Sequence, residues 1–562
     1  MDQISTPSYQ EYACRLFVNN IPLASSYEII SIQAKQAYQW ISSANILLKV
    51  DVSFGESLFS NPLEVLPLSG QEIEIIAVGT GNEVSLFKGL IVKHKYTNSP
   101  TGTRVHLTAK HSAINLSMNK KAEVYADKND KDIIEEIVQS VGLNTSFIQS
   151  QTFLGIQHKR LVKSGFTDWD FINMRAEANL SFVYTEPDIV VVEKPILSLE
   201  PAKQVSAIYG INVYSLEMEQ DDRLNLIEHQ FIHFDPSDQN SVVQSEENFV
   251  MPSLTSTIKG TKQDIFSASF NEMESKQALD SVIQLKNLSK VNGLVHIHAN
   301  LNVKPGYTLI VEGYQAEFNE HFIITSVLHD FSGGIFSTYL QFGMHHESFA
   351  TKYQPASSQH YSKGMINGIV VALEGDPDNL SRVLVSVPLW NRASENIWAR
   401  YVSPYAGNEY GMIWLPEIGD EVLIGFIGEE FEMPVVLGSM YSPAMPPFES
   451  FSDDNFKKGI QTKKGMKWNW DDEKGIHEIS VANGSKILIS EDENLVSIED
   501  ANGNSVILND SGMEIKSALD IKIEGGGKVD ISAGSELNLK AMNMNFNADG
   551  ILTLKGSLIK IN

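Results

Sequence analysis

Few residues of this chain have the types and spacing that metal binding requires. His296 and His298 lie two positions apart in a segment expected to be a strand, so both imidazoles would point to one face, as in half of a metal site. No third ligand is apparent near them, and ordinary structural side chains explain the pair. His345 and His346, followed by Glu347, would point to opposite faces of a strand, which does not suit chelation. We therefore predict no metal and no cofactor.

Candidates for acid–base or phosphate chemistry also have simpler interpretations. Asp376 and Asp378 flank Pro377, and paired carboxylates can transfer protons, but a Pro-Asp turn explains them. The run Gly525–Gly527 lacks the Lys-Ser/Thr and the helix that follow a phosphate-binding loop, and a wide corner explains it. The acidic run Asp471–Glu473 could hold a cation but is typical of a solvated turn. No Ser/His/Asp constellation has local support, so we expect no catalytic residue and no enzymatic activity.

Composition bounds the class of protein. The chain has 562 residues, 42% of them hydrophobic, which allows three or four domains with sizeable cores. A formal net charge of −27 argues against nucleic acid or an anionic membrane as an electrostatic partner. Cys14, the single cysteine, permits no intrachain disulfide and suits a small packed side chain better than a nucleophile.

Targeting signals are not visible in the sequence. Residues 1–10 carry no basic and apolar regions of a secretory signal, and no apolar stretch approaches the length of a transmembrane helix. We therefore expect the protein to fold in the cytoplasm and, if it is exported, to use a route that reads no N-terminal signal.

The elements that position these residues are mainly strands. Alternating apolar and polar residues predict half-buried strands at Ile46–Val52, Glu72–Ala77 and Ser85–Lys93. Further strands are expected between residues 292 and 342, at Tyr307–Glu312, Phe322–Leu328 and Ser337–Phe342.

Two helices interrupt this β pattern. Asn129 or Asp130 can cap a helix over Lys131–Val141, with Gly142 as its stop. Thr167 is the expected N-cap of a second helix over Asp168–Ala178, whose acidic first turn suits the helix dipole.

A compact unit of short strands follows residue 364. The expected strands are Met365–Leu373, Arg382–Val387, Ala399–Val402, Gly411–Leu415, Glu421–Ile427 and Val435–Met440. Five or six short strands in under eighty residues fit a small Greek-key barrel of the OB type, with Val422, Ile424 and Phe426 facing its interior. Many OB barrels bind nucleic acid through basic, aromatic faces, but this segment is rich in Glu and Asp, so the fold alone does not imply that function.

The last eighty residues repeat a pair of apolar residues, two positions apart, about every eight residues. The pairs are Ile479/Val481, Ile487/Ile489, Val496/Ile498, Val506/Leu508, Met513/Ile515, Ile521/Ile523, Val529/Ile531, Leu537/Leu539, Met544/Phe546, Leu552/Leu554 and Ile559/Ile561. Each octad fits one short strand with two side chains on one face, followed by a Gly- or Asn-containing turn. A fixed period of this kind indicates a stacked architecture.

Four geometries could bury these pairs. A single-chain β-helix needs coils of roughly 18–27 residues, a calcium-binding solenoid needs a nonapeptide motif that is absent here, and an ordinary β-sandwich does not explain the period. Three intertwined chains, each giving one strand per layer, suit an octad best. Eleven layers spaced by about 4.8 Å would make a rod on the order of 50 Å long.

The barrel segment resembles a known family. The matching motifs are Arg382-Val-Leu-Val-Ser-Val-Pro388, Trp398-Ala-Arg400, Ser403-Pro-Tyr-Ala-Gly407, Leu415-Pro-Glu-Ile-Gly-Asp-Glu-Val-Leu-Ile424 and Pro434-Val-Val-Leu-Gly-Ser-Met-Tyr441. They look like the OB domain of VgrG-type spike proteins, the central spikes of type VI secretion systems, which are related to phage tail hubs and spikes. Thr167–Glu177, Leu301–Gly306 and Ile324–His329 are similar to motifs of the family's hub region.

The resemblance implies a mainly β protein with four regions. These are a phage tail hub-like region at 1–355 (β-barrels with a small α/β insert), an OB-fold domain at 364–445, a neck at 446–475 and an intertwined triple-stranded β-helix of a homotrimer at 476–562. The trimer core is expected to include Ile515, Ile521, Ile523, Val529, Ile531, Leu537, Leu539, Leu552, Leu554, Ile559 and Ile561. Lys560, Ile561 and Asn562 are expected to dock a tip protein.

The resemblance also implies partners and a mechanism. The hub would cap an inner tube of Hcp-like protein within a baseplate, and the rod would carry a PAAR-type tip and effector proteins through a target membrane by mechanical force. The protein would assemble in the bacterial cytoplasm and then be ejected, without a nucleic-acid partner. A closely similar spike serves extracellular contractile injection particles and phage-like tails, which remain an alternative.

Other classes are less well supported by the residues. About 30 residues between Tyr441 and Ile476 are too few for the lysozyme domain of some phage spikes. Because the sequence stops on its last repeat, we also expect no toxin domain after the rod. A trimeric adhesin or tail fibre would not need the hub and barrel motifs. The last histidine, His477, is far from Asn562, so an iron-binding histidine tip is not expected.

Overall fold

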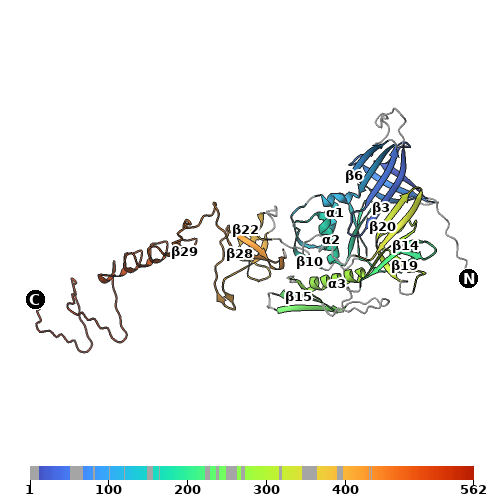
Figure 1. Cartoon of the computed structure of the whole chain (residues 1–562). Helices are drawn as coiled ribbons and strands as arrows, with labels where there is room; N and C mark the ends of the chain where they lie inside the picture. Colours follow the sequence, from blue (N-terminus) through green and yellow to red (C-terminus); the bar gives the residue numbers. More distant parts are fainter. Residues whose placement is uncertain are drawn as a thin grey trace. The chain divides into compact units, whose positions relative to one another are not determined.

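The computed structural model describes most of the chain in two compact units, Met1–Tyr441 and Ser442–Asn562 (Figure 1). The described residues are 12–50, 67–79, 83–99, 102–118, 120–148, 156–163, 165–221, 228–235, 240–247, 263–267, 272–315, 319–344, 364–388, 396–429, 431 and 433–561.

A 13-stranded sheet dominates the first unit. Its strands are β1 (Ala13–Val18), β2 (Ile21–Pro22), β3 (Tyr27–Ala37), β4 (Ser43–Val50), β5 (Glu72–Val78), β6 (Glu83–Ser99), β7 (Gly102–Lys110), β13 (Gln204–Ile208), β14 (Val213–Gln220), β18 (Val291–His298), β19 (Thr308–Glu312), β20 (His321–Ser332) and β21 (Ile335–Phe342). The order is β14-β18-β21-β20-β3-β4-β7-β6-β5-β1-β2, with β19 pairing β13 and β20 beside this path. The antiparallel pair β3–β20 therefore joins an N-terminal group of strands to a later group.

Alternation along these strands gives the sheet two unlike faces. In β7, Val105, Leu107 and Ala109 are buried in a hydrophobic core, whereas Arg104 and His106 between them are exposed. Side chains at i and i+2 share a face, so one face packs inward and the other is left to solvent or to a partner. The strands predicted at Glu72–Ala77 and Ser85–Lys93 are confirmed, and the one predicted from Ile46 begins earlier, at Ser43.

A small α/β insert follows β7. It contains β8 (Glu123–Asn129), α1 (Asp130–Gln139), β9 (Asn144–Ile148), β10 (Gln157–Lys163), α2 (Asp168–Ala178), β11 (Phe182–Glu186) and β12 (Ile189–Glu193). Both predicted helices are present with their predicted caps. The Asn129 side chain accepts from the Asp132 backbone N–H, and Thr167 forms a reciprocal capping box with Asp170. The first helix ends two residues before its predicted end.

The elements that the sequence did not predict include one helix and three strands between residues 228 and 289. They are α3 (Glu272–Ser289), β15 (Glu228–Asp235), β16 (Asn240–Glu247) and β17 (Gln263–Ser267). The strands form a separate sheet in the order β16-β15-β17. Glu272–Ser289 is rich in good helix formers, so its composition was the available signal.

The predicted OB-type barrel of five or six strands is confirmed, with five strands. It closes in the order β22-β23-β24-β28-β27 through β22 (Ile366–Ala372), β23 (Arg382–Ser386), β24 (Ile397–Tyr401), β27 (Glu421–Phe426) and β28 (Pro434–Ser439). Val422 and Ile424 are fully buried in its core, and Phe426 is only half-buried.

The strand predicted at Gly411–Leu415 is wrong. The chain there forms a two-residue ladder between β25 (Ala406–Gly407) and β26 (Tyr410–Gly411) and then leaves strand geometry. Residues 412–415 are tied to the barrel differently, because the Tyr401 hydroxyl donates to the Trp414 carbonyl at 2.6 Å, and Ile413 remains 88% exposed.

The second unit is an antiparallel meander followed by chain without regular structure. Its strands pair in sequence order as β29 (Lys457–Gln461), β30 (Lys467–Asp471), β31 (Ile476–Ser480), β32 (Lys486–Ser490), β33 (Leu495–Glu499), β34 (Ser505–Asn509) and β35 (Gly512–Lys516). The sheet thus begins inside the segment predicted as a neck. Residues 517–561 are described without a helix or strand.

Candidate functional site

Two rows of apolar side chains cross one face of the C-terminal meander. In cross-strand register, the first row is Trp468, Ile479, Ile487, Ile498, Val506 and Ile515, and the second is Trp470, His477, Ile489, Val496, Leu508 and Met513. Directly opposed residues of antiparallel strands share a face, as do residues two positions apart, so both rows lie on the same face. The octad pairs from Ile487 to Ile515 thus form a continuous apolar surface. Val481 of the first pair lies beyond the end of β31, and His477 takes the second position on that strand.

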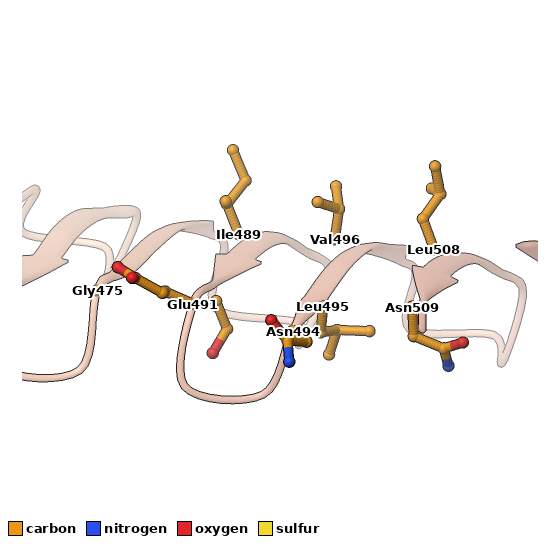
Figure 2. Close-up of a pocket in the computed structure, with 9 residues that line it drawn as sticks. Gly475, Ile489, Glu491, Asn494, Leu495, Val496, Leu508 and Asn509 are labelled. Carbon is orange, nitrogen blue, oxygen red and sulfur yellow. The ribbon is translucent and has the colours of Figure 1, made fainter. Parts of the chain in front are cut away.

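This surface, called here the apolar face, is open in a single chain. Nine of its twelve side chains are between 40% and 65% exposed. Figure 2 shows Ile489, Val496 and Leu508 projecting to the same side from three successive strands, while Asn509 and Leu495 project elsewhere. On the opposite face Leu488, Ser490 and Ser497 are buried. A contiguous exposed apolar surface of this kind marks an interaction site.

An aromatic cluster begins the apolar face. The Trp468 indole N–H donates to His477 Nε2 at 2.6 Å, and the Trp470 ring stacks on the His477 imidazole with centroids 5.3 Å apart. These contacts fix the histidine among apolar neighbours, so its place in the second row has a structural explanation.

The groove in Figure 2 does not offer catalytic chemistry. Its lining residues are Gly475, Ile489, Ser490, Glu491, Asn494, Leu495, Val496, Leu508 and Asn509. One carboxylate, one hydroxyl and two amides on an open surface provide no nucleophile–base pair, which would need side chains within hydrogen-bond reach.

The predicted trimer-core residues lie in two different parts of the second unit: one on a strand of the meander and the rest in the chain that follows it. Ile515 lies on β35 at the end of the first row. The others, from Ile521 to Ile561, lie outside any strand and are between 51% and 90% exposed, so a single chain does not gather them. Of the residues predicted to dock a tip protein, Lys560 and Ile561 are exposed, and Asn562 lies outside the described residues. Both assignments therefore stay predictions.

His296 and His298 lie on β18 of the 13-stranded sheet, called here the hub sheet after the region in which it was predicted, and are packed among aromatic rings. The Tyr214 ring lies 4.6 Å from the His296 ring and 4.7 Å from the His298 ring, and Tyr339 stacks on His296 at 4.0 Å. Burial lowers the pKa of His296. No three His, Cys, Asp or Glu side chains of the described residues are grouped to hold a metal ion. His345, His346 and Glu347 lie outside those residues.

The carboxylates that flank Pro377 are engaged by an arginine. Arg382 donates to Asp376 and to Asp378, each at 2.6 Å, and Asp376 also accepts from the backbone N–H groups of Leu380 and Arg382. These bonds hold the pKa of Asp376 well below its ordinary value, chiefly through the hydrogen bond from Arg382. An arginine-bound carboxylate with a lowered pKa is suited to holding the loop rather than to transferring protons.

The remaining candidates have structural roles. Asp471 accepts from the backbone N–H groups of Glu473 and Lys474, and Asp472 pairs with Lys458, so the acidic run closes a turn. Burial raises the pKa of Cys14 to about 12, which disfavours the thiolate that a nucleophile needs. Gly525–Gly527 lies in the part of the unit without strands.

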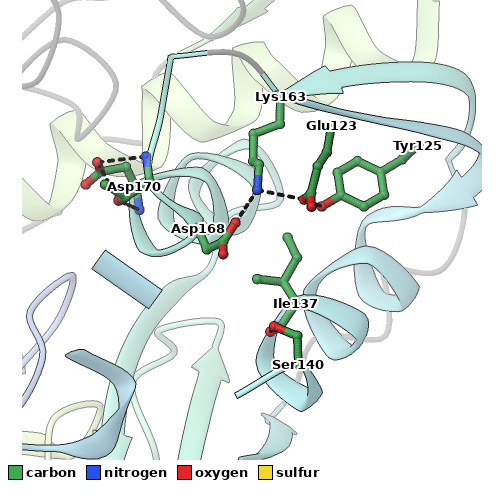
Figure 3. Close-up of polar contacts among 8 residues, drawn as sticks. Glu123, Tyr125, Ile137, Ser140, Lys163, Asp168 and Asp170 are labelled. Carbon is green, nitrogen blue, oxygen red and sulfur yellow. Dashed lines mark hydrogen bonds and ion pairs between the residues drawn. The ribbon is translucent and has the colours of Figure 1, made fainter. Parts of the chain in front are cut away.

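Two buried charge clusters in the insert were missed by the sequence analysis. Lys163, with no exposed surface, donates to Glu123 at 2.8 Å and pairs with Asp168 (Figure 3). The Tyr125 hydroxyl also donates to Glu123. Since Asp168 opens α2, the buried ammonium ties the start of that helix to the antiparallel strand pair β8–β10. The sequence feature that could have indicated this cluster is Lys163, which ends β10 just before the capping box of α2.

The second cluster centres on Asp130. Arg175 donates to both carboxylate oxygens, at 2.6 and 2.8 Å, Asn179 donates at 2.7 Å, and His158 lies 3.2 Å away. Burial alone would raise the pKa of Asp130, but Arg175 and His158 hold it far below the ordinary value. Both clusters anchor helices and contain no reactive group that faces solvent.

Two family models match the chain. Residues 10–333 match the Alg8 N-terminal domain, and residues 366–441 match the type VI secretion system/phage-baseplate injector OB domain. The first model covers more than half of the sequence. The chain belongs to the family defined by the Alg8 N-terminal domain.

Curated relatives agree with the predicted resemblance. The chain is 22% identical over 391 residues to the actin cross-linking toxin VgrG1 of Vibrio cholerae, covering 62% of this chain and 34% of that protein. It is 37% identical over 78 residues to the type VI secretion system spike protein VgrG4b of Pseudomonas aeruginosa, covering 13% of this chain and 10% of that protein. The chain thus spans about a third or less of the length of these relatives.

The fold also matches a solved assembly. A chain of the Francisella PdpA–VgrG complex superimposes with a TM-score of 0.55 at 10% identity, over 91% of this chain and 80% of that chain. The predicted resemblance to VgrG-type spikes and the mainly β fold with an OB-type barrel are confirmed. Among the residues that the structure describes, no helix is long and apolar enough to cross a membrane.

Proposed function

We propose that three copies of this chain form the central spike of a contractile injection machine. The copies would associate through the apolar face and continue as an intertwined rod through the octads from Ile521 to Ile561. The observation that carries the proposal is the pair of in-register apolar rows, half-exposed in one chain and followed by further octads of the same period.

The size of the apolar face favours association. Fully burying an aliphatic side chain stabilises by about 1.5–3 kcal/mol, so completing the burial of half-exposed ones gives roughly 1 kcal/mol each. A dozen such side chains would contribute on the order of 10 kcal/mol per chain, comparable with the roughly 4–15 kcal/mol that association costs. Three-fold closure offers each chain two neighbours and leaves no apolar edge.

The partners proposed for this chain are those expected of VgrG-type spikes. The hub-like part would cap an Hcp-like inner tube within a baseplate, and the rod end around Lys560 would seat a PAAR-type tip protein. The solved Francisella assembly joins PdpA to VgrG, which supports a bound effector or other protein on a spike of this fold. Assembly would take place in the bacterial cytoplasm, followed by ejection toward a target membrane.

The proposed mechanism is mechanical and needs no catalytic residue. Sheath contraction would push tube and spike forward, and a rod whose strands are shared among three chains would transmit the force. The same construction would serve a type VI secretion system or an extracellular injection particle. Genes beside this one would separate the two, since a membrane-anchoring complex belongs to type VI secretion.

The test is the mass of the purified full-length chain in solution. Sedimentation analysis is expected to give three times 62.4 kDa. Ile498→Asp is the informative variant, because Ile498 is 53% exposed in a single chain and would tolerate a charge there, whereas a trimer would bury three carboxylates at one level.

The matched control is Asn509→Asp, which adds the same charge at an exposed position. We expect Ile498→Asp to dissociate or aggregate and Asn509→Asp to stay trimeric. A wild-type monomer, or an Ile498→Asp trimer as heat-stable as the wild type, would refute the proposed assembly. Loss of tube and spike release from cells that lack the sheath would test the injection role separately.

A further inference from the structure

Part of the hub sheet is basic although the chain is strongly acidic. The segments 27–37, 43–50, 90–99 and 102–110, which belong to β3, β4, β6 and β7, contain six lysine or arginine residues and one carboxylate. The basic residues are Lys35, Lys49, Lys93, Lys95, Arg104 and Lys110, and the carboxylate is Glu28. The whole chain carries a formal charge of −27. These four segments therefore concentrate positive charge in a chain that is acidic as a whole.

Strand register places these side chains on one face. Lys49 opposes Arg104, Lys95 opposes His106, and Lys93 opposes Thr108. Lys35 and Lys110 both oppose Ser43 from either side of β4. The residues between them, such as Val105 and Leu107, point into the hydrophobic core, so the six cations all lie on the outward side, called here the basic face.

Most of these cations have no carboxylate partner in the part of the chain that the structure describes. Lys49 pairs with Glu28 at 3.2 Å, whereas no ion pair involves Lys93, Lys95 or Arg104, all of them exposed. Like charges about 7 Å apart repel by roughly 0.6 kcal/mol per pair in water, so the free face stores unrelieved repulsion. An anionic partner would relieve it.

The chemistry of the face favours an acidic polypeptide over nucleic acid. Binding of single strands needs aromatic side chains on which bases stack, but Tyr96, the aromatic residue of segment 90–99, opposes the buried Val105 on the inner side. The net negative charge of the chain opposes duplex DNA, which carries about one negative charge per 1.7 Å, more strongly than a short acidic segment. An extended acidic segment repeats its side chains about every 7 Å, the same spacing as Lys93 and Lys95.

We propose that the basic face is a docking surface for an acidic segment of a protein partner, rich in Asp and Glu and bound in extended form. The proposal stands on the hub sheet alone and does not depend on the trimeric rod. A net charge of −27 does not preclude a local cationic surface of this kind.

The test is the binding of fluorescein-labelled poly-L-glutamate to the purified full-length chain, followed by fluorescence anisotropy at low and moderate salt. The variant Lys93→Glu/Lys95→Glu/Arg104→Glu reverses three exposed cations of the face. The control Lys463→Glu/Lys464→Glu/Lys474→Glu makes the same formal charge change at exposed positions of the other unit. We expect the face variant to bind at least tenfold more weakly and the control to bind within twofold of wild type.

A second variant and two further binding measurements decide between the possible results. If the reversal variant fails to fold, as judged by circular dichroism, Lys93→Gln/Lys95→Gln/Arg104→Gln replaces it, with the same expected direction. Absent poly-glutamate binding by the wild type, or equal loss in both variants, overturns the proposal. Tighter binding of a 20-base-pair DNA duplex, lost in the face variant, would assign the face to nucleic acid instead. Salt-induced loss of self-association without poly-glutamate binding would assign it to a second copy of the chain.

Discussion

Arg175 and Asp130, 45 positions apart, form a bidentate ion pair in the interior of the α/β insert. The guanidinium Nε lies 2.6 Å from one carboxylate oxygen and Nη2 lies 2.8 Å from the other. Asp130 opens α1 and Arg175 lies in the last turn of α2, so the pair fixes the two helices to each other. His158 and Asn179 complete the shell around the carboxylate.

Removing the charge of Asp130 should destabilise the first unit strongly. Breaking one partner of a buried pair costs about 3–5 kcal/mol because it leaves the other charge buried without compensation. Asp130→Asn is expected to lower the unfolding temperature accordingly, as followed by circular dichroism. Asp132→Asn, also in the first turn of α1, is the control and should cost less than about 1 kcal/mol. Equal effects would show that the pair is not specifically stabilising.

Glu193 gives the first unit a pH dependence of the opposite kind to that of most carboxylates. Its Oε2 lies 3.5 Å from the Tyr38 hydroxyl, and a Cβ added at Gly306, which has a φ of +89°, would lie 2.1 Å from that oxygen. Burial raises the pKa of Glu193 to about 7. The folded chain therefore keeps a proton between about pH 4.5 and 7 that the unfolded chain has lost, and stability falls as pH rises through this window.

The measurement compares Glu193→Gln with wild type in urea unfolding at pH 5, 6, 7 and 8. The amide stays neutral, so the variant should match wild type near pH 5 and exceed it at pH 8 by up to about 3 kcal/mol. Glu217→Gln, at an exposed position of β14, should leave the wild-type trend unchanged. A wild-type stability that does not fall between pH 5 and 8 would contradict the assignment.

Removing the capping box of α2 should reduce stability less than removing the buried ion pair. Thr167 Oγ1 accepts from the Asp170 backbone N–H at 3.1 Å and donates to the Asp170 carboxylate at 2.7 Å. Thr167→Ala should cost about 1 kcal/mol, and Thr167→Ser should restore most of it, since serine caps as well as threonine. Thermal unfolding of both variants distinguishes a lost cap from a lost packing contact, because serine also lacks the threonine methyl group.

Local signals explain which elements the sequence predicts well. Thr167 and Asn129 cap their helices with neighbours three positions away, so the starts of α2 and α1 are encoded within one turn. Strand alternation within the barrel is similarly local. The contact between Arg175 and Asp130 is not, because only the packing of two helices brings them together.

Part of the basic face could have been predicted from the sequence. Lys93 and Lys95, like Arg104 and His106, are spaced by two positions in strands, which predicts a shared face for each pair. What sequence alone does not supply is the register of β6 against β7, which aligns Lys95 with His106 and makes one surface of two short motifs. Averaging charge over 562 residues hides such a surface.

The octads beyond Lys516 allow the sharpest test of the rod, because neighbouring residues should behave in opposite ways. Ile523 is 70% exposed in one chain and carries no strand pairing, so a monomer would accept Ile523→Asp with an effect near zero. In an intertwined trimer the same change buries three carboxylates at one level, a penalty of several kcal/mol. Lys522→Asp, one position away and expected to face outward in the rod, makes a larger charge change but should leave the trimer intact. Heat dissociation of the trimer, followed by light scattering, should therefore fall sharply for Ile523→Asp alone, and equal curves for both variants would exclude an interior rod at this level.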